Sequence, residues 1–238
     1  MKKNITVNSK AMYLLAYAMG LVFILSACSS DDVADEFVAL SGKITSTAAP
    51  AGETGVTVEG IYSNTSILNP TTVTVSDGTF TLNVLKNTAV TVQISKSGFV
   101  TLNSAREAFS ASETGIDIEL PTTDEANAVI AQAFPAQTLA SGAWLAVSVE
   151  DNTDTELAGV TITTTQANII DEAATNCDGT NSGDIVTIYD PCVPERDGPM
   201  YWAYFSADQD VSVSVSGAGA TGSQTGPVSN GEVTFFDF

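Results

Sequence analysis

The sequence predicts an all-β protein made of two tandem β-sandwich domains. From residue 37 onward, short segments rich in Val, Ile, Thr and Phe alternate with clusters of Gly, Asn, Asp, Ser and Pro. In residues 79–84 the apolar side chains occupy every second position, as in a strand with one buried and one exposed face. The composition, 44% hydrophobic and only 15% charged, is that of a folded chain despite a net charge of -20.

The first domain is expected to span residues 37–121. Its predicted strands are residues 37–45, 55–62, 71–75, 79–85, 89–95, 99–102 and 115–120. Asp77-Gly78 supplies the positive φ that a tight turn between two strands needs, and Gly98 permits a bend before Phe99 re-enters the core.

Four features of this domain occur in a familiar order: Gly42, then residues 55–58 (Gly-Val-Thr-Val), 76–82 (Ser-Asp-Gly-Thr-Phe-Thr-Leu) and 96–100 (Lys-Ser-Gly-Phe-Val). Over about residues 38–120 they resemble the carboxypeptidase regulatory-like domain, a transthyretin-like sandwich. The resemblance implies a scaffolding, presenting or binding role and supplies no catalytic residues.

Residues 122–141 are predicted to link the two domains. Thr123, Asp124 and Glu125 suit the start of a short helix, and apolar residues follow at three- and four-residue spacing until Pro135. An irregular linker is the alternative.

The second domain is expected to span residues 142–238, as an immunoglobulin-like or transthyretin-like sandwich. Its predicted strands are residues 143–150, 158–165, 184–189, 200–206, 210–216 and 232–238. Val211, Val213 and Val215 alternate with polar residues, which again indicates a strand with one buried face.

Residues 1–27 are predicted to be a signal peptide, followed by a polar tether over residues 28–36. Lysines precede an uncharged apolar run that ends in Leu25-Ser26-Ala27-Cys28. This ending resembles the bacterial lipoprotein signal, which is cleaved just before the Cys. The alternative is an uncleaved membrane anchor, for which the apolar run is short.

The lipoprotein resemblance implies that Cys28 carries the acyl chains that hold the protein in a membrane. Ser29 and Ser30 follow the Cys in place of Asp, which in this family favours the outer membrane. Whether the domains face the periplasm or the cell surface stays open. The acidic charge makes nucleic acid an improbable partner.

The chain contains no histidine, which excludes Ser-His-Asp and Cys-His catalysis and His-ligated zinc. We therefore expect a non-enzymatic protein with no cofactor, which presents or binds a protein or glycan of the cell envelope. A hydrolase that depends on paired carboxylates is the alternative. The sequence leaves the oligomeric state open.

Cys177 and Cys192 are predicted to form a disulfide, because an exported chain matures in an oxidising compartment. A reactive thiol pair is the alternative. Between them, Asp178 and Asp184 lie in an oxygen-rich loop, which suggests a calcium site or simply solvated turn residues.

Tyr201, Trp202 and Tyr204 lie on one predicted strand with aromatic rings on both faces. If one face were exposed, it would form a stacking platform for sugar rings. Packing of both faces in the core is the alternative.

Overall fold

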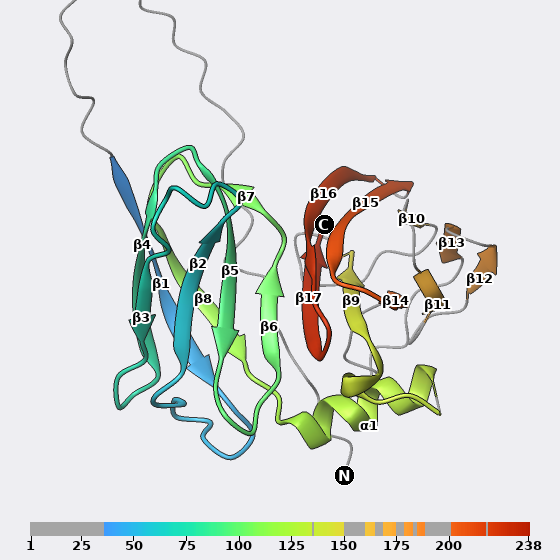
Figure 1. The fold of residues 1–238 in the computed structure, drawn as a ribbon, viewed down its shortest axis with the longest axis horizontal. Helices are drawn as coiled ribbons and strands as arrows, with labels where there is room; N and C mark the ends of the chain where they lie inside the picture. The colour runs from blue at the N-terminus through green and yellow to red at the C-terminus, as the bar shows by residue number, and fades with distance from the viewer. Residues whose placement is uncertain are drawn as a thin grey trace, which may run out of the picture.

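The computed structural model describes residues 36–134, 136–149, 160–164, 169–174, 179–182, 185–188, 201–217 and 219–238. Strands dominate this part of the chain, so the predicted all-β class is confirmed. Strands β1–β8 form what we call the first module, and strands β9–β17 form the second module (Figure 1).

The strands of the first module follow the predicted ranges closely. They are β1 (Phe37–Thr45), β2 (Thr57–Tyr62), β3 (Thr71–Val73), β4 (Thr79–Leu85), β5 (Ala89–Ser95), β6 (Thr101–Ser104), β7 (Glu107–Ala108) and β8 (Glu113–Glu119). The bounds of β1, β4 and β5 match the prediction, whereas the two-residue strand β7 was not predicted.

The second module contains more strands than the sequence pattern predicts. They are β9 (Ala143–Ser148), β10 (Thr161–Thr164), β11 (Ile169–Ala174), β12 (Gly179–Ser182), β13 (Ile185–Ile188), β14 (Tyr201–Phe205), β15 (Gln209–Gly217), β16 (Ala220–Val228) and β17 (Glu232–Asp237). Strands β11, β12 and β16 were missed. In β16 the residues Gly222, Gly226 and Pro227 are of types that are uncommon within strands, so the sequence does not indicate a strand there.

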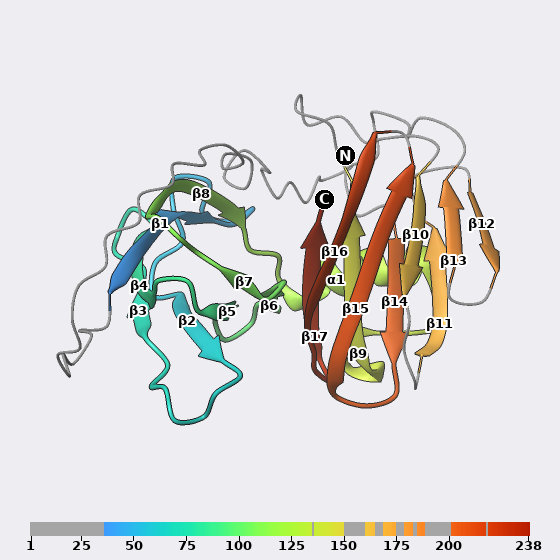
Figure 2. The same cartoon turned by 90° about the horizontal axis from the view of Figure 1, so that it is seen from above.

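A nine-stranded sheet runs through both modules. Its order is β11-β14-β9-β17-β6-β5-β2-β3, and β7 also pairs with β5. The last strand, β17, lies between β6 of the first module and β9 of the second and is parallel to both (Figures 1 and 2). Val233 is paired with Leu102 on one side and with Trp144 on the other. The two predicted sandwiches are therefore joined by continuous sheet, while their boundaries as domains stay predictions.

The two faces of this sheet are covered by different layers. Over the first module the cover is a three-stranded sheet of order β4-β1-β8, in which β1 and β8 are parallel. Over the second module a five-stranded sheet of order β12-β13-β10-β15-β16 covers the opposite face. Because side chains alternate along β17, Val233 belongs to the first core and Phe236 to the second.

Helix α1 (Thr123–Ala133) lies within the predicted linker and covers β9 and β14 on the face away from β15 and β16. In Figure 2, β15 and β16 lie in front of β9, and α1 lies behind it. Thr122 caps the helix: its side chain accepts a hydrogen bond from the Glu125 amide at 3.2 Å, and the Glu125 carboxylate accepts one from the Thr122 amide at 2.9 Å. A single 3₁₀ turn, Leu139–Ser141, follows the helix.

The two glycines singled out in the first domain both have positive φ, +79° at Gly78 and +86° at Gly98. Gly78 closes the turn before β4, where its amide donates to the Val75 carbonyl at 2.9 Å. A side chain at residue 78 would meet backbone, because its Cβ would lie 2.3 Å from the Ile44 carbonyl oxygen. Glycine is therefore required there for both conformation and space.

Candidate functional site

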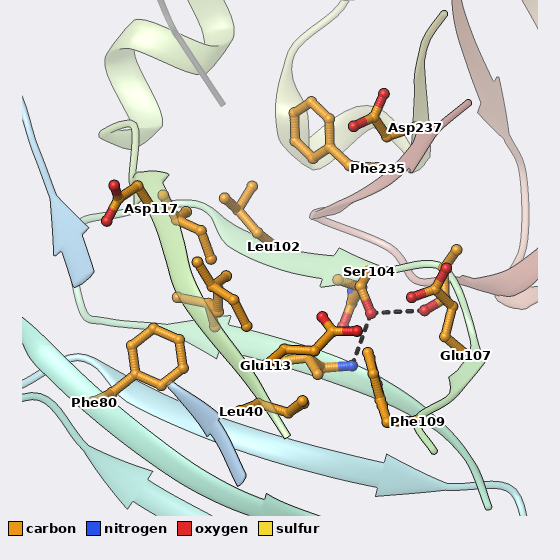
Figure 3. A pocket seen from close by; sticks show the side chains of 16 residues that line it. Leu40, Phe80, Leu102, Ser104, Glu107, Phe109, Glu113, Asp117, Phe235 and Asp237 are labelled. Atoms are coloured by element: carbon orange, nitrogen blue, oxygen red, sulfur yellow. Dashed lines mark hydrogen bonds between the residues drawn. The ribbon is translucent and has the colours of Figure 1, made fainter. Parts of the chain in front are cut away.

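A cavity of about 160 Å³ lies between the two sheets of the first module, where the covering sheet ends at β8. Its walls are mainly apolar and come from both sheets (Figure 3). The apolar lining residues are Leu40, Phe80, Val92, Ile94, Leu102, Ala105, Phe109, Ile116, Ile118 and Phe235.

The cavity is open to solvent along β8. The side chains of Ile116 and Ile118 are only partly buried, and Asp117 between them is exposed. Leu40 and Leu102, by contrast, are almost fully buried at 1% and 5% exposure, so the cavity extends inward to the core of the module. A cavity with mainly apolar walls and a few polar side chains is typical of small-molecule sites.

The polar residues that line the cavity are Asn103, Ser104, Glu107, Glu113, Asp117 and Asp237. Four of the six are acidic, and none of the described lining residues is Lys or Arg. In Figure 3, Glu107 and Glu113 lie on either side of Ser104. The Ser104 hydroxyl is already engaged, because it accepts from the Val92 amide at 2.9 Å and donates to the Ala105 carbonyl at 2.7 Å.

The two glutamates carry carboxyl groups that are difficult to ionise. Burial raises the pKa of Glu107, and the charge of Glu113 raises it further. Burial also raises the pKa of Glu113. Neither side chain forms a hydrogen bond or an ion pair with another described residue, so no protein cation compensates for the lost hydration.

A third carboxylate, that of Glu53, has a structural role instead. Burial acts to raise its pKa, but hydrogen bonds from Lys96 and Ser46, together with the charge of Lys96, lower the pKa below its ordinary value. Lys96 also donates to the Thr54 carbonyl at 2.7 Å. This cluster fastens the loop before β2 to the end of β5, and all its polar groups are satisfied within the protein.

The prediction of an exposed aromatic strand is wrong. Tyr201, Trp202 and Tyr204 are 1%, 4% and 6% exposed, so no ring is free to stack on a sugar. Tyr201 points into the core between the two sheets of the second module. Trp202 and Tyr204 point the other way, into the core that α1 covers.

Trp144 and Phe134 complete the aromatic cluster beneath the helix. Trp144 is stacked on Tyr204 with ring centroids 4.8 Å apart, and Phe134 of the helix end contacts both rings at 5.6 and 5.3 Å. The alternative of core packing on both faces is therefore the correct one, because α1 covers the face that the sandwich core leaves free.

The other predicted site residues lie outside the described residues. These are Cys28, Cys177, Cys192, Asp178 and Asp184. The lipid attachment, the disulfide and the calcium site accordingly stay predictions. Within the described residues, no group of three or more acidic or cysteine side chains is placed to hold a metal ion.

Sequence reasoning missed the cavity and its two glutamates. Glu107 and Glu113 lie beside residues typical of loops, such as Ser110 and Ser112. No local signal marks them, because the cavity arises only when β8, β6 and β17 come together from distant parts of the chain. None of the helices in the described part of the chain has the length and apolar character needed to cross a bilayer.

Comparison with known proteins gives only distant structural likenesses. No family model matches the sequence, and no curated protein matches it. Among solved structures, the chain is similar to a cohesin-X-dockerin complex from Acetivibrio cellulolyticus, at 21% identity and a TM-score of 0.30, over 49% of this chain and 79% of the other.

Two further structures are similar over more of the chain. One is the minor pilin GBS52 of Streptococcus agalactiae, at 10% identity and a TM-score of 0.28, over 84% of this chain and 94% of the pilin. The other is the TIE protein of Bacillus anthracis, at 10% identity and a TM-score of 0.28, over 85% of this chain but only 33% of that protein. Similarity at this level carries no argument about function.

Proposed function

We propose that the chain is a non-catalytic binding module of the bacterial envelope, anchored in the outer membrane by lipid on Cys28. The anchor is supported by the sequence Leu25-Ser26-Ala27-Cys28 at the end of an apolar run. The first module, with its carboxypeptidase regulatory-like pattern, serves as the binding domain, and the second module is joined to it through β17.

The observation that supports binding is the cavity of the first module. Its apolar walls could bury a ligand of modest size, and its polar side chains could orient that ligand. Ser104, the hydroxyl in the cavity, is held by two backbone contacts and is not free to act as a nucleophile. A hydrolase that uses Glu107 and Glu113 as its paired carboxylates remains the alternative to binding.

The anchor is tested by expressing the full chain in a bacterium that processes lipoproteins and supplying an alkyne-tagged fatty acid. We expect label on the wild-type chain and on the matched control Ser29→Ala, and none on Cys28→Ala. Both labelled proteins should remain with outer-membrane fractions after a high-salt wash. Label on Cys28→Ala, or an unlabelled wild-type chain, would overturn the anchor.

A further inference from the structure

We propose that the cavity between β8 and β6 binds a small amine, with the apolar body of the amine inside the first module and its ammonium group between Glu107 and Glu113. This inference rests on the proposed binding function and names its ligand class. It draws on the size of the cavity, its charge and the finding that neither carboxylate has a hydrogen-bond or ion-pair partner among the described residues.

The size of the cavity limits the apolar part of the ligand. A cavity of about 150 Å³ lined by Leu, Ile and Phe is known to accept a benzene molecule. The cavity here is about 160 Å³ and has the same kind of lining, including Leu40, Ile94 and Phe80. It therefore suits one aromatic ring or an aliphatic chain of about six carbons.

The charge at the mouth determines the polar part of the ligand. Glu107, Glu113 and Asp117 all line the cavity, and none of the described lining residues is Lys or Arg. An anionic head group would meet only like charge, and a neutral one would leave the acidic mouth without a partner. A cation is the complementary group.

The two glutamates are the specific partners of that cation. Both are partly buried and accept no hydrogen bond from a described residue, and they lie close enough for the charge of Glu113 to raise the pKa of Glu107. An ammonium group has three N–H donors and would supply the hydrogen bonds and the positive charge that both carboxylates lack. The attraction between opposite charges is also stronger where water is partly excluded.

Three cations of the first module already form ion pairs with described residues. Lys96 pairs with Glu53, and Lys86 pairs with Glu36 at 2.8 Å. Arg106, the nearest cation in sequence to Glu107, is held by Asp210 of the second module. The pair of glutamates therefore has no described protein cation within its own cluster and remains available for a ligand.

The test uses the full chain in lipid nanodiscs, with empty nanodiscs as the blank. Binding is measured by isothermal titration calorimetry with three probes of equal chain length, n-hexylamine, 1-hexanol and hexanoate. We expect hexylamine to bind at least about tenfold more tightly than hexanol, and hexanoate not to bind. Glu107→Gln and Glu113→Gln should each reduce the affinity for hexylamine toward that for hexanol, and leave hexanol unchanged.

Two further variants complete the design. Val92→Phe, which adds volume to the cavity wall, should abolish the binding of every probe, and Glu59→Gln on the neighbouring strand should change nothing. If hexylamine and hexanol bound with equal affinity and the Gln variants changed neither, the proposal of an amine ligand would be wrong, but the proposed binding function would still hold. If no probe bound, or if Val92→Phe had no effect, both proposals would fail.

Discussion

Arg106 and Asp210 form a bidentate salt bridge between the two modules. The two terminal guanidinium nitrogens of Arg106 donate to the two carboxylate oxygens of Asp210 at 3.0 and 2.9 Å. The backbone beside this pair is also shared, since the Arg106 amide donates to the Thr225 carbonyl at 2.7 Å. The chain after β6 is thus fixed to β15 and β16 by both side chain and backbone.

Asp210→Asn should destabilise the protein modestly. Asp210 is 60% exposed, so solvent screens the pair. Because the geometry is bidentate, we expect the free energy of unfolding to fall by about 1 kcal/mol, near the upper end for surface ion pairs. The matched control is Glu36→Gln, which breaks a single-contact pair with Lys86 inside the first module. Urea unfolding should show a lower free energy of unfolding for Asp210→Asn and almost no change for the control. Equal decreases in the two variants would contradict a larger contribution of the Arg106–Asp210 pair.

The sharing of β17 should make the two modules unfold together. Phe236 is 1% exposed and packs in the second core, so Phe236→Ala should cost about 3 to 5 kcal/mol. Because Val233, on the same strand, packs in the first core, hydrogen exchange should accelerate in β5 of the first module as well as in β15 of the second.

The control for this experiment is Phe37→Ala, since Phe37 is 57% exposed and its loss should leave both modules unchanged. If Phe236→Ala accelerated exchange in β15 while β5 kept its full protection, the modules would be independent and the shared strand would not couple them.

Stability should fall with rising pH through the ionisation of Glu107. Burial, and then the charge of Glu113, hold the pKa of Glu107 above its ordinary value in the folded protein. At pH values between the pKa of the unfolded state and that of the folded state, the folded protein therefore binds more protons than the unfolded protein. The contribution of Glu107 to the stability of the folded protein is fully present below the pKa of the unfolded state, and it is lost as the pH rises through the pKa of the folded state.

Glu107→Gln should therefore raise the melting temperature at neutral pH and flatten its decline above the ordinary glutamate range. The same variant is expected to weaken amine binding, so stability and binding would change in opposite directions. Glu59→Gln is the control, because its side chain accepts from Asn69 at the surface and Gln can keep that contact. A lower melting temperature for Glu107→Gln at neutral pH would contradict this prediction.

Gly78→Ala should destabilise the protein more than Gly98→Ala. Both positions have similar positive φ, which costs an alanine about 1 to 2 kcal/mol. Only at Gly78 would the new Cβ also collide with backbone, 2.3 Å from the Ile44 carbonyl, whereas at Gly98 no atom lies within 4 Å. Guanidinium unfolding of the two variants measures the decrease in the free energy of unfolding, which at Gly98 comes from backbone conformation alone and at Gly78 also from the steric clash. Equal decreases would show that the structure relieves the clash at residue 78 without cost.

The sequence by itself determined the strands whose apolar residues alternate, the start of α1 and the two glycines with positive φ. These features depend on neighbours along the chain: in β4, Phe80, Leu82 and Val84 alternate with exposed residues and mark one buried face. The acidic and histidine-free composition likewise limits the chemistry without reference to any fold.

Only the tertiary structure decided that β16 is a strand. Its Gly222 and Gly226 suggest a loop, yet their missing side chains make room for the rings of Phe238 and Phe236. The same is true of Trp202, which is buried because α1, from residues far earlier in the chain, covers its face of the sheet.

The cavity and the place of β17 between β6 and β9 also came from the tertiary structure. Alternation along a strand shows that one face is buried but not which partner covers it, because pairing such as that of Val233 with Leu102 and Trp144 joins residues that are far apart in the sequence. Local sequence therefore specified the elements, and long-range packing selected their neighbours and left the acidic opening beside β8.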